Sequence, residues 1–175
     1  MYRAVVLEPA YQGNIGFIAR LAENFSIDEL VYVDPQCAIG DEAVEYASHA
    51  DDRLQTARVV DDLGAAIEGL DFLVGTTGIK ASEENVLRNG TTPRQMVDDL
   101  PAGDIGVLLG REGKGLSNEE LDRCDVTVSI PTSDDYPVMN LSHAAAVIFY
   151  ELYTADTEER DSSSRERRAV LENLF

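Results

Sequence analysis

Residues 105–116 read IGVLLGREGKGL, and this stretch decides the fold class. The run Ile105–Leu109 is apolar apart from one glycine, which is typical of a strand that is covered on both faces. A glycine-rich loop, Gly110–Leu116, follows at once, and Ser117 with Glu120 forms the capping box of a helix. Strand, loop and helix in this order predict an α/β sheet, and such sheets bind ligands in the loops at the carboxyl ends of their strands.

The same order of strand, loop and helix recurs along the 175 residues. Strands are expected at residues 3–7, 29–33, 58–60, 71–75, 105–109 and 125–130, and helices at 14–25, 41–48, 62–68, 93–100 and 140–153. This alternation predicts a mostly parallel sheet covered on both faces. One domain is expected at residues 1–154. The polar residues that follow, 155–175, are expected to form a linker and the start of a C-terminal helical extension.

The chain is strongly acidic, with 33 Asp and Glu against 14 Lys and Arg and a net charge of -19. Such a surface repels a polyanion, but acidic, lysine-poor surfaces also suit a cytoplasm rich in salt, where the Debye length falls to about 3 Å at about 1 M. We interpret the charge as halophile-like, so it does not exclude RNA. No run is long enough to span a bilayer, and the N-terminus is too acidic for a signal peptide, so a cytoplasmic location is expected.

No metal site and no phosphate loop of the NTPase type are expected. Cys37 and Cys124 form no C-x-x-C motif, and the chain has two histidines, so zinc and a disulfide are both disfavoured. The glycine-rich loop departs from a P-loop because Leu108 replaces its first glycine and Gly115 replaces its magnesium-binding Ser or Thr. A kinase or NTPase is therefore disfavoured.

Two further motifs stand before helices. The first is Gly13-Asn-Ile-Gly-Phe-Ile-Ala-Arg20, and the second runs from Ile130 to Ser142. Arg20 lies off the apolar face of its helix, which allows two interpretations: an exposed arginine paired with a carboxylate, or a cation beside a helix N-terminus that suits anions. Asn140 or Ser142 is a candidate cap for the last helix.

Taken together, the three motifs resemble those of the SPOUT superfamily of RNA methyltransferases, and most closely the TrmJ-like tRNA 2′-O-ribose methyltransferases of its TrmH group. The resemblance covers residues 2–153 and rests on the stretches 8–20, 110–121 and 130–152. It implies an α/β fold with a deep C-terminal trefoil knot, S-adenosyl-L-methionine as methyl donor, and tRNA as substrate at nucleotide thirty-two of the anticodon loop. It also implies a homodimer whose active sites are each completed by the partner subunit, with no metal and no membrane.

The resemblance also assigns roles to residues. Arg20 would be the central catalytic group and, being always protonated, would stabilise the ribose alkoxide. Asn14 would orient Arg20 or the ribose, while Glu112 and Asn140 would shape the motif loops. The cofactor would be held by residues of three loops: Thr76, Thr77, Gly78, Gly110, Ile130, Pro137, Val138 and Met139.

One departure from the family pattern leaves alternatives open. Val138 stands where many relatives carry a serine, so a catalytic role of that serine cannot transfer to this chain. The absence of this serine favours a SPOUT-fold RNA-binding or assembly protein without turnover, whereas the presence of Asn14, Arg20 and Glu112 favours the enzyme. A methyltransferase that acts on rRNA is a further alternative.

Overall fold

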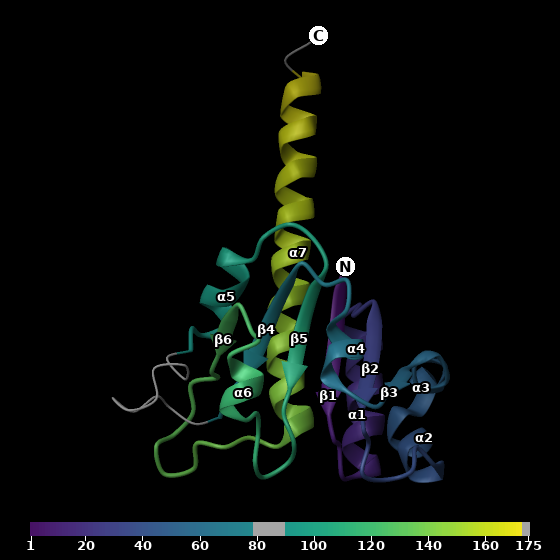
Figure 1. The fold of residues 1–175 in the computed structure, drawn as a ribbon. Helices are drawn as coiled ribbons and strands as arrows, with labels where there is room; N and C mark the ends of the chain where they lie inside the picture. Colours follow the sequence, from purple (N-terminus) through teal and green to yellow (C-terminus); the bar gives the residue numbers. More distant parts are fainter. Residues whose placement is uncertain (79–89, 173–175) are drawn as a thin grey trace.

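A computed structural model describes residues 1–78 and 90–172, with side chains up to residue 157. Six strands form one sheet in the order β3-β2-β1-β5-β4-β6 (Figure 1). The strands are β1 (Tyr2–Leu7), β2 (Glu29–Val33), β3 (Arg58–Val60), β4 (Phe72–Thr76), β5 (Ile105–Leu109) and β6 (Val126–Val128). All five pairings between neighbouring strands are parallel, which confirms the predicted parallel sheet.

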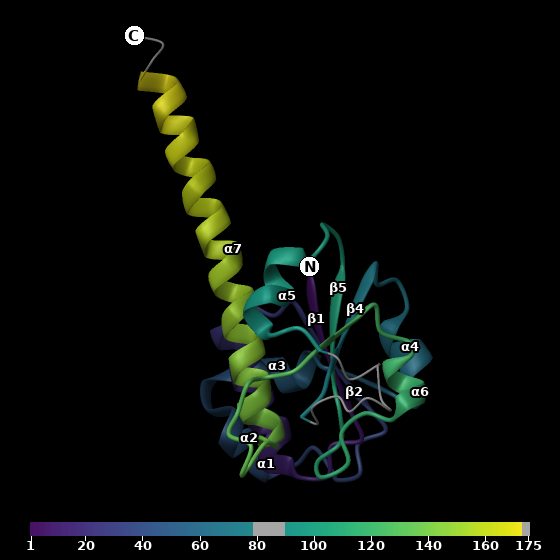
Figure 2. The ribbon, with the colours of Figure 1, turned by 90° about the vertical axis from the view of Figure 1, so that its left-hand side faces the viewer.

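Helices cover both faces of the sheet (Figure 2). One face carries α1 (Gln12–Asn24), α2 (Asp41–Ala47), η1 (Ser48–Ala50), α3 (Asp51–Thr56), α5 (Pro93–Asp99) and α7 (Leu141–Glu172), and the other carries α4 (Leu63–Ile67) and α6 (Asn118–Leu121). No helix in these described ranges is both long and apolar enough to cross a membrane.

The core follows the two-residue alternation of the strands. Val6 and Tyr32 are fully buried toward α1 and α7, whereas their neighbours Val5 and Val31 are buried toward α4 and α6. The Tyr32 hydroxyl donates a hydrogen bond of 2.9 Å to the carbonyl oxygen of Ile15, so this buried polar group keeps a partner. Apolar side chains on both faces therefore hold the sheet between its two helical layers.

The predicted elements agree with the structure to within two residues at either end, with two exceptions. Residues 49–56, which form the rest of η1 and α3, were assigned to no element. The last helix was expected to end near Tyr153, but α7 continues unbroken to Glu172 and projects beyond the sheet (Figure 1). The residues expected to form a linker and the start of an extension, 155–175, therefore belong to this helix as far as Glu172, and the division into a domain and an extension stays a prediction.

The physical reason for the longer helix lies in what residues 155–172 lack. They contain neither Gly nor Pro, so nothing in them breaks a helix, and their polarity marks exposure to solvent instead of a helix end. Two hydroxyls in this part also bond within the helix: Thr154 Oγ1 donates to the carbonyl oxygen of Tyr150 at 3.0 Å, and Thr157 Oγ1 to that of Tyr153 at 2.8 Å.

The strand order decides where the loops of the three motifs meet. β1, β5, β4 and β6 are neighbours in the sheet, and because they are parallel their carboxyl ends share one edge. The loops that follow these four strands, and the start of α7, therefore gather at that edge.

Candidate active site

The loop after β5 is a tight turn built on its glycines. The backbone N–H of Gly115 donates to the carbonyl oxygen of Arg111 at 2.9 Å, which closes the loop. Gly113 and Gly115 have φ angles of 78° and 66°, a left-handed conformation that favours glycine. A Cβ atom on Gly110 would lie 2.4 Å from the carbonyl carbon of Gly115, so no larger residue fits there.

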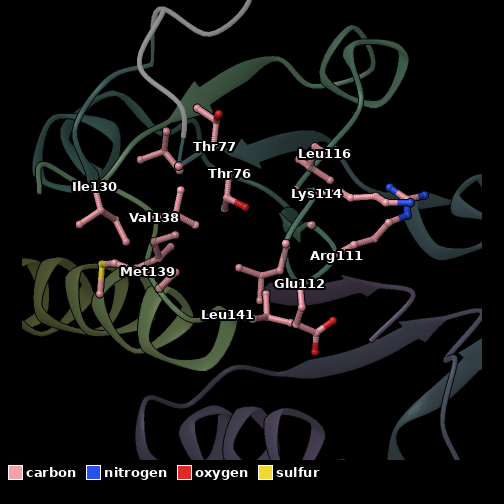
Figure 3. A pocket seen from close by; sticks show the side chains of 18 of the residues that line it. Thr76, Thr77, Arg111, Glu112, Lys114, Leu116, Ile130, Val138, Met139 and Leu141 are labelled. Atoms are coloured by element: carbon pink, nitrogen blue, oxygen red, sulfur yellow. The ribbon is translucent and has the colours of Figure 1, made fainter. Parts of the chain in front are cut away.

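This loop forms one wall of a pocket, and the loops after β4 and β6 form the others (Figure 3). All eight residues expected to hold a cofactor line it: Thr76, Thr77, Gly78, Gly110, Ile130, Pro137, Val138 and Met139. Ala144 and Ile148 of α7 also line it, although Ile148 is buried in the core. We call this space the inner pocket.

Hydrogen bonds tie the end of β4 to both neighbouring strands beside the inner pocket. Thr76 Oγ1 donates to the carbonyl oxygen of Leu108 at 2.9 Å, and the N–H of Thr77 donates to the carbonyl oxygen of Val128 at 2.9 Å. The first bond joins the end of β4 to β5, and the second joins it to β6. The start of the loop after β4 is therefore fixed against the strands that lead into the other two loops.

A second space, which we call the outer cleft, adjoins the inner pocket. It is lined by Tyr11, Asn14, Glu112, Gly113, Tyr136, Pro137, Val138, Met139, Asn140, Leu141 and His143. Six of these residues also line the inner pocket: Glu112, Gly113, Pro137, Val138, Met139 and Leu141. The two spaces are therefore separated only by side chains that both of them touch.

Asn14 and Glu112 meet at this boundary. Asn14 Nδ2 donates to Glu112 Oε1 at 2.9 Å, and the backbone N–H of Ala10 donates to Glu112 Oε2 at 3.1 Å. Asn14 is 7% exposed, so its amide is fixed in the protein interior. The start of α1 thereby holds the carboxylate of the loop after β5, a pairing that sequence reasoning did not assign.

Asn140 caps α7. Its Oδ1 accepts hydrogen bonds from the backbone N–H of Ser142 at 2.9 Å and from Ser142 Oγ at 2.7 Å. Ser142 is buried, and its hydroxyl is committed to this cap. It therefore does not replace the hydroxyl that is missing at Val138, whose side chain lies at the boundary of the two spaces.

Arg20 stands apart from the other expected catalytic residues. It is exposed on α1 and lines neither the inner pocket nor the outer cleft. Within the part of the chain that the structure describes, its guanidinium has no hydrogen bond and no ion pair. The expected pairing with a nearby carboxylate is thus not seen there, and one subunit alone does not bring Arg20 to Asn14, Glu112 and Asn140.

Sequence reasoning missed an ion-pair cluster around Arg111. Its guanidinium donates to both oxygens of Glu120, at 2.8 and 2.9 Å, and also to Glu8 Oε1. These hydrogen bonds hold the pKa of the Glu8 and Glu120 carboxyls below their usual 4.5 and raise the pKa of Arg111. The cluster ties the end of β1 and the helix α6 to the loop that lines the inner pocket. Sequence alone places Glu8 more than one hundred residues from Arg111, which hides the contact.

Replacing Arg111 is expected to loosen this loop. Arg111→Met should lower the free energy of unfolding at neutral pH by about 2 kcal/mol, because two carboxylates lose charged hydrogen bonds. A carboxyl whose pKa is lowered by folding stabilises the folded state at pH values above its unfolded-state pKa of 4.5. This contribution to the free energy of unfolding is lost as the pH falls through the lowered pKa values. The unfolding free energies that denaturant titrations give for the two proteins should therefore begin to converge as the pH falls below about 4.5, and the difference should close only below the lowered pKa values.

The matched control for this prediction is Arg123→Met, because Arg123 is exposed just after α6 and forms no ion pair with the residues that the structure describes. Its effect on the unfolding free energy should stay within about 0.5 kcal/mol. The assigned role of the cluster would be contradicted if both variants lost the same free energy of unfolding. It would also be contradicted if the loss in Arg111→Met stayed unchanged at low pH.

The fold and the site define a class of protein: a parallel α/β protein that holds a small ligand among the loops at the carboxyl edge of its sheet. Within that class, the chain belongs to the SpoU rRNA Methylase family, whose sequence model matches residues 1–150.

Its relatives agree with this assignment. The chain is 41% identical over 180 residues to the tRNA (cytidine-2′-O-)-methyltransferase TrmJ of Methanocaldococcus jannaschii, a match that covers 98% of this chain and 78% of the relative. It is 34% identical to the enzyme of the same name from Sulfolobus acidocaldarius, covering 86% of this chain and 64% of that one. A solved structure of a probable methylase family protein from Haemophilus influenzae superposes with a TM-score of 0.84 at 29% identity, covering 91% of this chain and 68% of that chain.

Proposed function

We propose that this chain transfers a methyl group from S-adenosyl-L-methionine to a ribose 2′-hydroxyl of tRNA. The observation that carries the proposal is the inner pocket with its adjoining outer cleft, since methyl transfer needs a donor and an acceptor held side by side. The relatives from M. jannaschii and S. acidocaldarius are named for this reaction on cytidine. Nucleotide thirty-two of the anticodon loop is the proposed target.

The residues of the inner pocket suit S-adenosyl-L-methionine. Leu109, Leu116, Ile130 and Ile148 provide apolar walls for a flat ring. Gly110 lets the loop after β5 close tightly on itself at this wall, since a Cβ there would meet the backbone of Gly115. Glu112 and Lys114 add charged groups at the same wall. When bound, the cofactor supplies a methyl group already activated by the sulfonium. The protein is left with the tasks of aligning the acceptor oxygen and stabilising its developing charge.

The protein's residues divide these tasks. Glu112, held by Asn14 and the N–H of Ala10, keeps the first helix and the cofactor loop in register at the boundary between the two spaces. Asn140 fixes the start of α7 beside them. Arg20 would stabilise the alkoxide that forms as the 2′-hydroxyl gives its proton to water, because a preorganised cation there favours the charged transition state. The oxygen would take the methyl group from the sulfonium, and S-adenosyl-L-homocysteine would be left.

The position of Arg20 supports a homodimer with shared active sites. Arg20 lies outside both spaces of its own subunit, so it would enter the outer cleft of the partner. Phe17 is on the same face of α1, three residues away, and packs against Tyr46 with ring centroids 4.7 Å apart. Each of these rings remains 39% exposed, which suits a surface that a second copy covers.

We also propose the trefoil knot of the family between β4 and α7. Gly78, after β4, lies against Val138, which precedes α7, at 3.7 Å for a Cβ placed on the glycine. Thr77 is bonded to Val128 of β6. These contacts support a path in which the segment that follows β6 passes back against the loop that follows β4.

The dimer is open to a direct measurement. Light scattering at micromolar protein in high salt should give twice the chain mass of 19.1 kDa. A monomeric mass under conditions where methylation proceeds would contradict the shared site.

The reaction is tested in two steps. Calorimetry should show binding of S-adenosyl-L-methionine to the folded chain, and mass analysis of nuclease-digested tRNA should then show a new 2′-O-methylated nucleoside. RNA binding without product would favour the non-catalytic alternative, and a product found in rRNA alone would favour the rRNA alternative. Failure to bind the cofactor at saturation would refute the proposal.

The helical extension is expected to supply RNA affinity. Arg165, Arg167 and Arg168 form the basic cluster of an otherwise acidic chain, on the part of α7 that projects beyond the sheet, and their side chains lie outside the described residues. Replacing all three by Gln should weaken tRNA binding and reduce the slope of log affinity against log salt by about 2. An unchanged slope in binding titrations at several salt concentrations would show that the domain alone contacts the phosphates.

A further inference from the structure

Two tyrosines at the outer cleft hold their rings in solvent. Tyr11 is 65% exposed and Tyr136 is 83% exposed, and both line the cleft. An exposed aromatic ring forgoes the stabilisation that burial would give it. The other exposed tyrosines on the described surface, Tyr46, Tyr150 and Tyr153, each contact a phenylalanine ring. Tyr11 and Tyr136 contact no ring within the described part of the chain.

The backbone around both rings is well anchored. Tyr11 precedes α1, and its carbonyl oxygen accepts hydrogen bonds from the N–H groups of Asn14 and Ile15 at 3.1 and 3.3 Å. Tyr136 lies in a turn where its N–H donates to the carbonyl oxygen of Ser133 at 3.2 Å. The two rings thus come from different loops, after β1 and after β6, and are carried on fixed backbone at one edge of the sheet.

The outer cleft is where the base of the target nucleotide must go. The methyl donor would occupy the inner pocket, and the two spaces meet at Glu112, Val138 and Met139. A ribose at that boundary directs its base away from the donor and into the outer cleft. A base that has left the stack of a single-stranded loop is held most often by stacking on aromatic side chains.

We propose that Tyr11 and Tyr136 stack on the base of the nucleotide whose ribose is methylated. The inference rests on the proposed function and adds the residues that hold the acceptor. Stacking also suits the acidity of the chain. At a net charge of -19 the protein gains little affinity from contacts with phosphates, and salt weakens these contacts further. Stacking on a neutral ring needs no charge.

Stacking supplies affinity without choosing the base. Every base has a π face, so an aromatic platform tolerates different bases. The two amide side chains that line the cleft each have one polar atom engaged within the protein. Asn14 Nδ2 donates to Glu112, and Asn140 Oδ1 accepts the hydrogen bonds of the helix cap. Removing either ring should therefore reduce turnover of cytidine and uridine targets by the same factor.

The kinetic test compares Tyr136→Leu, Tyr11→Leu and Tyr136→Phe with the wild-type protein on tRNAs that carry cytidine or uridine at the target position. The leucine variants should lose roughly tenfold to a hundredfold in kcat/KM for tRNA, mainly through KM, while Tyr136→Phe, which keeps the ring, should stay within about twofold. The affinity for S-adenosyl-L-methionine should not change. Val59→Ala, an exposed position on the far strand β3, serves as the control.

The outcomes separate the two proposals. Absence of methylation by the wild-type protein would count against the proposed function. Normal kcat/KM in both leucine variants, with wild-type methylation intact, would overturn the stacking role alone. A change in the ratio of cytidine to uridine turnover would show that the rings read base edges, which also overturns it.

A direct readout uses tRNA with 5-iodouridine at the target nucleotide, because this base forms photocrosslinks to rings stacked on it. Irradiation of the complex, followed by peptide mapping, should place the crosslink on Tyr11 or Tyr136, and the corresponding leucine variant should lose it. A crosslink to residues outside the outer cleft would refute the proposal.

Discussion

Arg20→Ala is expected to lower kcat for tRNA methylation by about a hundredfold or more, as removal of a single transition-state donor does elsewhere. The affinity for S-adenosyl-L-methionine should remain nearly unchanged, because Arg20 lines neither the inner pocket nor the outer cleft of its own subunit. The fold should also be intact, since the side chain is exposed and contacts no described residue by hydrogen bond or ion pair. Single-turnover kinetics with saturating cofactor, together with calorimetry, measure both quantities.

Arg20→Lys is the informative companion variant. It keeps the positive charge but loses the planar fork of the guanidinium, so partial activity would indicate that charge near the alkoxide matters more than paired hydrogen bonds. Wild-type rates in Arg20→Ala would contradict the catalytic assignment. Loss of cofactor binding in this variant would instead make Arg20 a structural residue.

Gly110→Ala should weaken cofactor binding by about a hundredfold or more, since displacing a binding loop by about 1 Å can have an effect of that size. The added methyl group would lie 2.4 Å from the carbonyl carbon of Gly115, 2.6 Å from the nitrogen of Leu116 and 2.8 Å from the Cα of Gly115. All three are backbone atoms, so no side-chain rotation relieves the clash and the loop itself must move. Calorimetry with S-adenosyl-L-methionine measures the effect directly.

Gly13→Ala provides the matched control. Its added methyl group would meet side chains at ordinary contact distances, Tyr46 at 3.4 Å and Glu42 at 3.9 Å, and Gly13 does not line the inner pocket. Its cofactor affinity should equal that of the wild type. Full cofactor affinity in Gly110→Ala would show that the loop after β5 does not hold the cofactor.

The two inactive variants together test whether the active site is shared. If Arg20 acts in the partner's site, a mixed dimer of Arg20→Ala and Gly110→Ala has one site with both lesions and one intact site. With random exchange of subunits, about a quarter of the wild-type activity should return on mixing. If Arg20 acts within its own subunit, every site carries a lesion and mixing restores nothing.

The sequence by itself determined most of the elements and the parallel sheet. Strand periodicity, the capping box at Ser117 and the glycine loop are local properties, set by side-chain alternation and backbone conformation over a few neighbours. The eight expected cofactor residues came instead from the family resemblance, and in the structure they line one pocket. The end of the last helix was the exception, because a rise in polarity was interpreted as a linker although no residue there breaks a helix.

Only the tertiary structure decided which distant residues meet. It paired Arg111 with Glu8, joined Asn14 to Glu112, and placed Tyr11 and Tyr136 at one cleft. It also showed that Arg20 lies outside that cleft in its own subunit. These contacts arise because the strand order brings the ends of β1, β5, β4 and β6 to one edge, and that order depends on packing between segments far apart in the chain, which no local pattern records.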